Sequence, residues 1–299
     1  MPSWQDFQPF IVSGLALGGV YALSGVGMVV LYQATGVVYL AFGAVGAMGA
    51  LIAWSLAQAG APGWVGWLAC VAFSAVVTLG YGMVFGPALA KRDPLVKAVA
   101  TLGLTLVLFG VMDLLWTTSG GRSRAITLPT DNPAFMIGQV QVIWTQVIGL
   151  GVGVAIAVGI GAFLRYTKLG TAMRAMANDR EITATLGVPV RRVEAAAWLG
   201  CGVLAGVAGL LLADLVALDA TTLTFLVISS LAATLIARLR SITLTFLAAL
   251  LIGLVHDLLT PIQSLTNYRD MTPFVLAAVA LLVISRRRVM STAASREEA

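Results

Sequence analysis

The segment Ile11–Leu31, IVSGLALGGVYALSGVGMVVL, contains no charged residue. A transmembrane helix needs about 20 mostly apolar residues, because the hydrocarbon core of a bilayer is about 30 Å thick. This segment meets that requirement, and similar apolar runs recur along the rest of the chain. We predict further spans at Val37–Ala57, Trp64–Leu89, Ala98–Trp116, Val142–Leu164, Ala195–Ala217, Leu223–Ala237, Ile242–Thr260 and Met271–Ser285.

The number of crossings depends on two short runs. Leu223–Ala237 and Met271–Ser285 are short for a full crossing, which favours a re-entrant or tilted segment. We therefore predict an all-α, polytopic transmembrane helical bundle with eight or nine membrane segments. Residues 1–299 are predicted to form a single integral membrane domain, because no stretch has the composition of a separate soluble domain.

The composition excludes an ordinary soluble protein. Hydrophobic residues make up 59% of the 299 residues and charged residues 10%, and the mean hydropathy is +0.96. A soluble domain carries about 25% charged residues, so too few charges remain here to coat a surface facing water. We attribute the net charge of +5 to Lys and Arg residues enriched in cytoplasmic loops, and not to a surface that binds nucleic acid.

The positions of the basic residues predict an orientation. If Lys91–Lys97 is cytoplasmic, nine crossings place the N-terminus outside and the C-terminus inside. All but three of the 18 Lys and Arg residues then face the cytoplasm, the exceptions being Arg122, Arg124 and Arg269. Cytoplasmic loops are enriched in Lys and Arg, which supports this arrangement. Residues 117–141 become an external loop with some local β structure, and residues 165–194 become the largest cytoplasmic loop.

Several other classes of protein are excluded by what the chain lacks. Cys70 and Cys201 lie far apart in apolar runs, which is typical of small buried residues and not of a disulfide or zinc site. The single histidine excludes paired metal ligands, and no phosphate-binding loop is present. We expect no catalytic and no metal-binding residue on this chain. Met1–Pro9 has no Lys or Arg, so the first apolar run is not expected to be a cleaved signal peptide.

Small residues and one acid are candidates for contacts inside the membrane. Gly43, Gly46 and Gly49 recur every three residues, and such spacing lets helix backbones approach closely. They indicate either ordinary helix packing or a helix that lines a translocation path or meets a partner. Asp257 lies near the outer end of its span, where a role in the path or in pinning two helices is open.

The cytoplasmic loop contains a predicted helix. Thr171–Leu186 has no Pro or Gly and is rich in good helix formers, while Gly187 and Pro189 are typical of a helix end. A helix of about four turns therefore lies between two spans. It is suited to dock in a groove of a partner, although a helix lying on anionic lipid remains the alternative.

The order of several motifs resembles the branched-chain amino acid ABC permeases. The opening Gly14–Leu23, GLALGGVYAL, is similar to the first segment of that family, and Ala100–Leu104 and Thr127–Pro129 match in order. Leu204–Leu211 resembles the segment after its cytoplasmic loop. Within that loop the resemblance identifies a coupling helix to an ATPase, formed around Arg174, Ala175, Ala177, Asp179, Ala184, Leu186 and Gly187.

The resemblance implies an importer built from several chains in the bacterial inner membrane. This chain and a homologous permease would form the path, two cytoplasmic ABC ATPases would bind ATP and Mg²⁺, and an external binding protein would deliver the solute. The chain itself would hold no cofactor. Branched-chain amino acids are the expected solutes, together with related amino acids, amides, urea and small acids.

One departure bears on the solute, and one alternative remains. The family typically has Asn-Phe-Ala-His-Gly-Glu in its second span, where this chain has Tyr39–Ala44, YLAFGA. Tyr39 and Phe42 are therefore further candidates for the path, and the loss of polar groups favours a more apolar solute. The alternative function is a stand-alone, ion-coupled secondary transporter, which would often show inverted repeats.

Overall fold

The computed structural model describes residues 4–90, 92–116, 133–137, 140–216, 220–261, 268, 271–280 and 282. These residues are almost entirely helical, as predicted, and include one short β-hairpin. The elements in chain order are α1 (Trp4–Thr35), α2 (Phe42–Gln58), α3 (Gly63–Leu89), α4 (Pro94–Trp116), β1 (Pro133–Ile137), β2 (Val140–Ile143), α5 (Trp144–Tyr166), α6 (Lys168–Asn178), α7 (Arg180–Thr185), α8 (Val190–Leu215), α9 (Ala220–Ile236) and α10 (Ile242–Leu258). A further helical stretch covers residues 272–280.

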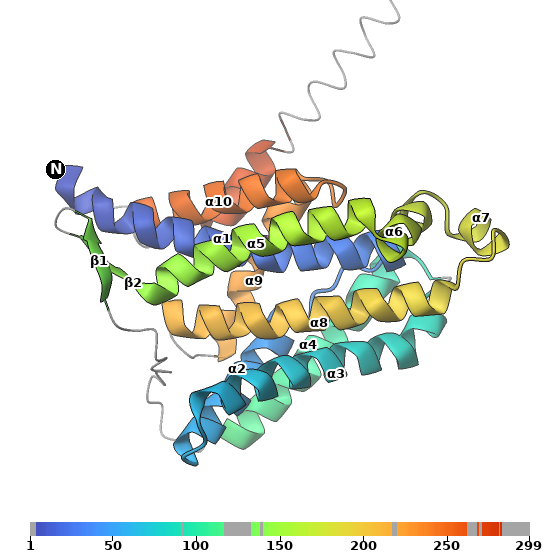
Figure 1. The fold of residues 1–299 in the computed structure, drawn as a ribbon, viewed down its shortest axis with the longest axis horizontal. Coiled ribbons are helices and arrows are strands. Elements are labelled where there is room, and N and C mark those ends of the chain that lie inside the picture. The colour runs from blue at the N-terminus through green and yellow to red at the C-terminus, as the bar shows by residue number, and fades with distance from the viewer. Residues whose placement is uncertain are drawn as a thin grey trace, which may run out of the picture.

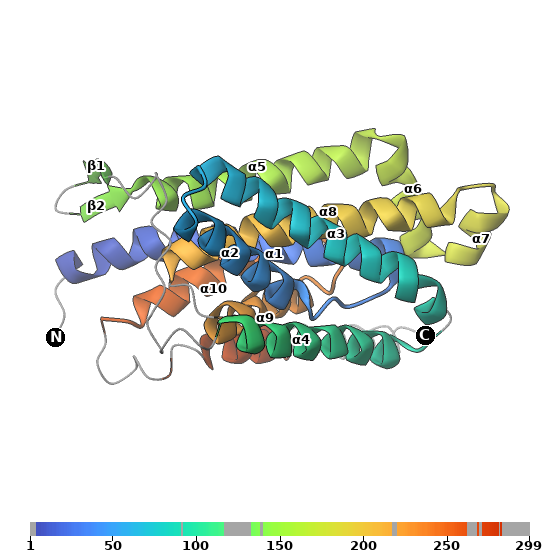
Figure 2. The ribbon, with the colours of Figure 1, turned by 90° about the horizontal axis from the view of Figure 1, so that it is seen from below.

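The long helices lie side by side and form an elongated bundle (Figure 1). The helices α6 and α7 lie at one end of the bundle, while the hairpin and the start of α1 lie at the other, as Figure 2 also shows. Five helices, α1, α3, α4, α5 and α8, are long and apolar enough to cross a membrane. The apolar helices α2, α9 and α10 are shorter.

The helix α1 forms the centre of the bundle. In the most apolar stretch of α1, 94% of the residues are buried, whereas the corresponding share is 22% in α4 and 17% in α5. The helices α5, α8, α9 and α10 all pack against α1. A helix that is apolar and buried on every side, such as α1, belongs to the core. The helices α4 and α5 are at least as apolar but mostly unburied, so they present apolar faces outward.

Glycines bring pairs of helix backbones into direct contact. At Gly253 on α10 an added Cβ would collide with the backbone of Gly18 on α1. At Gly46 on α2 an added Cβ would come within 2.6 Å of the carbonyl oxygen of Ala205, and Gly209 on α8 lies against the backbone of Gly46. In lipid, where apolar surface gains little by leaving the solvent, such close packing holds helices together.

The sequence predicted that the second span begins at Val37, but the helix begins five residues later, at Phe42. The helix α1 ends at Thr35, the following Gly36 has a left-handed φ of +67°, and α2 begins only at Phe42. Glycine adopts this backbone conformation without the steric penalty of a side chain. Residues 36–41 therefore form a non-helical connection, whose Val37, Tyr39 and Ala41 are buried in the bundle.

Side chains from neighbouring helices satisfy the backbone of this connection. The Thr101 hydroxyl on α4 accepts a hydrogen bond from the Leu40 amide at 3.1 Å and contacts the Val38 carbonyl at 3.0 Å. The hydroxyl of Tyr39 lies 3.3 Å from that of Thr78 on α3. The Tyr39 ring is perpendicular to that of Trp198, with 5.4 Å between the ring centroids. Non-helical backbone within a membrane protein persists only where protein supplies such partners.

The remaining predicted spans overlap the observed helices, and the ends of those predicted at 195–217 and 271–285 lie outside the described residues. The span predicted at 195–217 corresponds to α8, which begins at Val190 because Pro189 precedes it, and the span predicted at 11–31 lies within the longer α1. Part of the predicted external loop, residues 117–132, lies outside the described residues. Its end forms the antiparallel hairpin of β1 and β2, in which Ile137 pairs with Val140.

The contact between α2 and α8 generates a stability prediction. Replacing Gly46 by Leu forces side-chain atoms against the backbone of Ala205 and Gly209, and overpacking of this kind costs about 1–3 kcal/mol. We expect Gly46→Leu to lower the melting temperature of the purified protein in detergent by roughly 5 °C or more. The matched control is Gly80→Leu on α3, where an added Cβ meets no atom within 4 Å. Equal melting temperatures for the two variants would contradict the packing argument.

Candidate functional site

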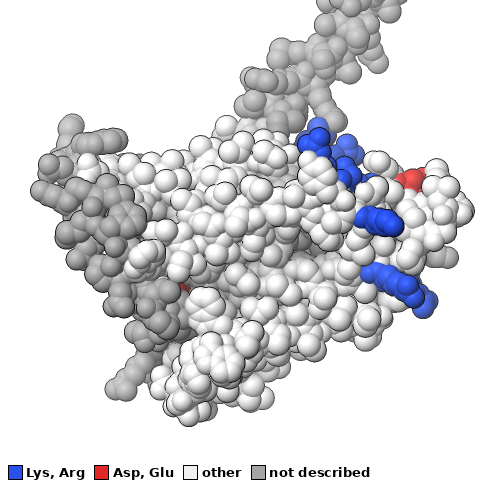
Figure 3. Space-filling model, in the orientation of Figure 1, with Lys and Arg blue, Asp and Glu red and all other residues white. Residues whose placement is uncertain are grey.

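Basic side chains gather at the end of the bundle that carries α6. Figure 3 shows Lys and Arg at this end and an uncharged face between the two ends. This is the one-sided distribution that the sequence predicted for a membrane protein. The side of the membrane on which this end lies remains a prediction.

The helix α6 folds back against the end of the bundle. Its N-cap is Thr167, whose hydroxyl accepts a hydrogen bond from the Gly170 amide at 3.0 Å. An added Cβ at Gly170 would collide with the backbone of Phe163 and Leu164, so the sharp corner between α5 and α6 requires glycine there. Met173 and Met176 are buried on the inner face of α6, which contacts α1, α5 and α8.

The predicted single helix of about four turns is wrong, because the loop contains two helices. The helix α6 begins at Lys168, earlier than predicted, and ends at Asn178. Asp179 has an extended backbone and is the N-cap of α7, with its carboxylate accepting a hydrogen bond from the Ile182 amide at 2.9 Å. Aspartate is a preferred N-cap residue, because its side chain satisfies an amide that the first helical turn leaves free.

Both ends of α7 are held in place. Arg180, at its start, reaches Glu194 on α8, with Nη2–Oε1 and Nε–Oε1 distances of 2.6 and 3.0 Å. At the other end Gly187 has a φ of +82°, and its amide donates to the Ala184 carbonyl. The prediction that Gly187 terminates the helix is therefore confirmed, and its reason is the left-handed backbone.

The loop presents its outer face to the surroundings. Of the residues predicted to meet an ATPase, Ala175 is half-buried and six are exposed: Arg174, Ala177, Asp179, Ala184, Leu186 and Gly187. The side chain of Leu186 is 76% exposed. Ile182, which the sequence analysis did not single out, is 60% exposed. The two lie four residues apart and hence on neighbouring turns of one face. The signal that could have found Ile182 is Asp179, since an N-cap there sets the phase of the helix.

The predicted path residues on the second span lie inside the chain. Tyr39 and Phe42 are fully buried, Gly43 packs against Thr224 and Val227 of α9, and Gly49 packs against Cys70 and Ser74 of α3. Gly46 meets α8, as described above. A cavity of about 10 Å³, the size of one water, lies beside Phe42, Gly43 and Gly46. In this structure these residues therefore form contacts between helices of one chain.

Asp257 pins α10 to α1 at the end opposite α6. The Ser13 hydroxyl donates a hydrogen bond to the Asp257 carboxylate at 2.5 Å. His256 Nδ1 lies 3.2 Å from the other carboxylate oxygen. Because Ser13 and Asp257 are on different helices that pack along their length, the pair fixes the register of α10 on α1. Of the two roles left open by the sequence, this geometry corresponds to helix pinning.

The described residues contain no group of three or more His, Cys, Asp or Glu side chains that could bind a metal ion. Cys70 and Cys201 are both buried thiols without a disulfide. The Cys70 thiol donates to the Gly206 carbonyl at 3.4 Å, which contributes to the contact between α3 and α8.

Curated proteins similar to this chain are transport permeases. The high-affinity branched-chain amino acid transport system permease protein LivH of Escherichia coli (strain K12) is 24% identical over 289 residues, covering 91% of this chain and 92% of LivH. The corresponding permease protein BraD of Pseudomonas aeruginosa is 26% identical over 299 residues, covering 94% and 95%. A probable LivH of Methanocaldococcus jannaschii is 29% identical over 181 residues, which is 58% of this chain and 55% of that protein.

A solved structure shares the fold. PsaBC from Streptococcus pneumoniae in complex with Fab aligns with a TM-score of 0.52 at 15% identity, covering 92% of this chain and 89% of that one. At this identity the likeness concerns the fold alone. Residues 10–284 match the family described as branched-chain amino acid transport system / permease component, which is most of the chain. The chain therefore belongs to this family of membrane permeases.

Proposed function

We propose that this chain is the membrane-spanning permease subunit of an ATP-driven importer for branched-chain amino acids or related small solutes. A homologous permease would complete the path, two ABC ATPases would bind ATP and Mg²⁺ at the α6–α7 end, and an external binding protein would deliver the solute. In this arrangement the N-terminus lies outside the inner membrane and the C-terminus lies in the cytoplasm.

The observation that carries this proposal is the two-sided loop between α5 and α8. Its inner side, with Met173 and Met176, is buried against the bundle. Its outer side exposes Ile182 and Leu186 at the basic, water-facing end. Exposed apolar side chains on a short, well-fixed helix are typical of a surface that docks in a partner's groove. An ATPase subunit is the partner that a permease of this family requires.

The geometry suggests how movement would pass from the ATPases to the path. The helix α6 packs on the end of α1, and Arg180 ties α7 to α8 through Glu194. Closure of the ATPases on ATP would thus displace α6 and α7 together with the ends of α1 and α8. Because packed helices move as bodies and not by continuous deformation, this displacement would open one side of the path and close the other.

The transported solute is proposed to carry an apolar side chain. The bend between α1 and α2 and the start of α2 contain Tyr39 and Phe42, where polar residues are typical of the family. These side chains pack between helices in this structure, so the proposal requires that the transport cycle expose them to the path. An apolar side chain such as that of leucine would then gain free energy from burial among them, whereas urea would leave its hydrogen bonds unmade. Branched-chain amino acids are therefore expected to be transported better than urea.

The composition of the importer is tested first. The tagged chain is purified in mild detergent after co-expression with the products of its chromosomal neighbours, and the complex is reconstituted in liposomes. We expect a P-loop ATPase and a second permease to co-purify, and leucine uptake to require ATP and to exceed urea uptake. An ATPase subunit without its P-loop lysine is the control. Uptake by this chain alone, driven by an ion gradient, would overturn the proposed importer. Better uptake of urea than of leucine would overturn the proposed preference for an apolar side chain.

The docking surface is tested at its most exposed apolar residue. Leu186→Asp places a charge where the ATPase groove is expected to be apolar, so ATP-driven leucine uptake should fall at least tenfold. The side chain is 76% exposed, so insertion and melting temperature should stay unchanged. Leu186→Met, which keeps an apolar side chain, serves as the matched control and should retain uptake. Full uptake by Leu186→Asp would show that this surface does not transmit the ATPase movement.

The link between α7 and α8 is tested by exchanging its charges. Arg180→Glu and Glu194→Arg should each lower the number of leucine molecules transported per ATP hydrolysed, because like charges push α7 away from α8. The pair is partly exposed, so each change should cost only about 0.2–1 kcal/mol of stability. The double exchange restores opposite charges and should recover most of the coupling. A double variant as poorly coupled as the single ones would contradict a lever held by this pair.

A further inference from the structure

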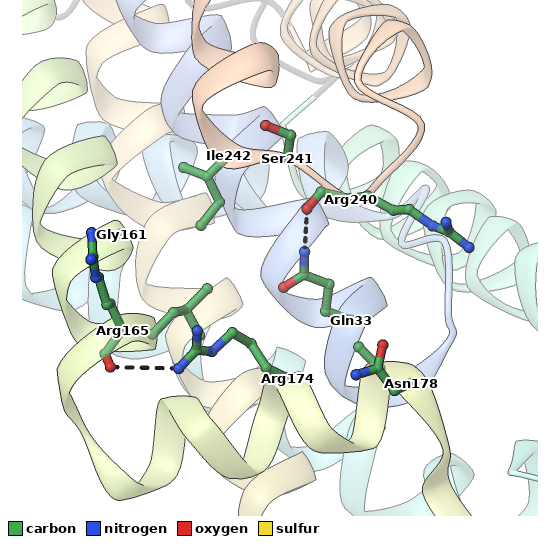
Figure 4. A pocket seen from close by; sticks show the side chains of 10 residues that line it. Gln33, Gly161, Arg165, Arg174, Asn178, Arg240, Ser241 and Ile242 are labelled. Atoms are coloured by element: carbon green, nitrogen blue, oxygen red, sulfur yellow. Dashed lines mark hydrogen bonds between the residues drawn. The ribbon is translucent and has the colours of Figure 1, made fainter.

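A second feature of the basic end is a cavity behind α6. It has a volume of about 650 Å³ and lies between the ends of α1 and α5, the helix α6 and the turn that joins α9 to α10 (Figure 4). This volume is in the range of sites for small organic ligands. Leu186 and Ile182, the exposed apolar residues of the surface proposed to meet an ATPase, do not line this cavity, although Arg174 and Ala177 of the predicted coupling residues do. The cavity therefore calls for an explanation of its own.

One side of the cavity is cationic and polar. Arg165, Arg174, Asn178 and Gln33 line it, and none of the described lining residues is acidic. The Arg174 guanidinium lies over the floor of the cavity, with Nη2 at 3.5 Å from the Arg165 carbonyl, as Figure 4 shows. This bond is long and uses one of five N–H donors, so the guanidinium keeps donors for an anion.

Gln33 and the turn after α9 fix the back of the cavity. The Gln33 amide donates to the Arg240 carbonyl at 2.9 Å, and the Arg240 side chain extends away beyond Gln33 (Figure 4). The same turn holds Arg238 and Leu239 in left-handed conformations, with φ of 56° and 57°. Such conformations cost non-glycine residues about 1 kcal/mol or more each and persist where the surroundings impose them. The back wall is thus preformed.

The other side of the cavity is apolar and belongs to two membrane helices. Gly161 and Leu164 come from α5, and Ile242 comes from the start of α10. Farther along α5, toward its middle, Val158 is 67% exposed, so the apolar side continues into an outward-facing surface. A free inorganic anion gains no free energy from contact with an apolar wall, whereas an amphipathic molecule can bury its apolar part there.

The ends of α5 show where the membrane interface lies. Trp144 and Tyr166 at its two ends are both largely exposed, and they are separated by roughly 33 Å along the helix. Exposed Trp and Tyr side chains mark the two interfaces of a membrane, and this spacing matches a hydrocarbon core of about 30 Å. Arg165 adjoins Tyr166, with its guanidinium carbon 5.7 Å from the ring centre. The cationic part of the cavity is therefore level with lipid head groups.

We propose that this cavity binds the head group of an anionic phospholipid. The phosphodiester would accept hydrogen bonds from Arg174 and Arg165, and the glycerol and the start of one acyl chain would lie between Gly161 and Ile242. Basic pockets between membrane helices are suited to such head groups, since they combine charge complementarity with access from the bilayer. The bound lipid would join α6 to α5 and α10. The inference rests on the cavity and holds for any transported solute.

The test measures lipid binding and not transport. The purified full chain is titrated with dioctanoyl phosphatidylglycerol and, separately, with zwitterionic dioctanoyl phosphatidylcholine, and bound lipid is counted by native mass spectrometry. We expect the anionic lipid to bind at least tenfold more tightly. Arg174→Gln should weaken its binding about tenfold, whereas the control Arg191→Gln, an exposed arginine at the same end outside the cavity, should change it less than twofold.

A second pair of variants tests the apolar wall without altering any charge. Gly161→Leu fills the cavity from the α5 side, and Gly159→Leu adds the same side chain outside the cavity. Neither position has an atom within 4 Å of an added Cβ, so both variants should fold, which their melting temperatures check. We expect Gly161→Leu alone to weaken phosphatidylglycerol binding tenfold or more.

Three results would overturn the proposal. The first is equal affinity for the two lipids, because the arginines would then contribute nothing. The second is an effect of Gly161→Leu no larger than that of Gly159→Leu, because no chain would then lie against α5. The third is complete displacement of phosphatidylglycerol by millimolar inorganic phosphate, which would identify a site for a small anion. None of these readouts depends on the ATPase, so failure here and failure of the proposed importer are distinguishable.

Discussion

Close backbone contact between helices is the constraint on which the rest of this structure depends. Within a bilayer, separated helices gain little from hiding apolar surface, so they are held by packing and by hydrogen bonds. The pairs Gly18–Gly253 and Gly46–Gly209 bring α10 onto α1 and α8 onto α2 without side chains between them. The connection at 36–41 is buried within the same bundle, where Thr101 completes its hydrogen bonds.

The same central helix relates the two ends of the molecule. At one end Asp257 fixes α10 to the start of α1 through Ser13. At the other, Met173 and Met176 of α6 are buried against the bundle where α1 ends. A displacement of α6 would therefore be applied to the most deeply buried of the long apolar helices. This arrangement gives the family's permease role a physical basis, since a rigid core transmits movement where a loose one would absorb it.

The sequence predicted much of this fold, and its errors have identifiable causes. Apolar runs located the membrane helices to within a few residues, and Gly187 correctly marked the end of α7, because these signals are local. The loop between α5 and α8 was predicted as one helix because Thr171–Leu186 contains good helix formers throughout. Asp179 instead caps a new helix, and Arg180 is drawn to Glu194, a partner that helix propensity does not consider.

By itself, the sequence determined that the chain is an all-α membrane protein, and it predicted most of the basic residues on one side, since composition and hydropathy are enough to choose lipid as the solvent. It also determined the family, through motifs whose order is preserved. Only the tertiary structure decided that Tyr39 and Gly43 face neighbouring helices, that Ile182 faces outward, and that Arg174 lines a cavity. Hydropathy measures each residue's preference for lipid or water, whereas these roles depend on which helices meet, and that depends on contacts between residues far apart in the chain.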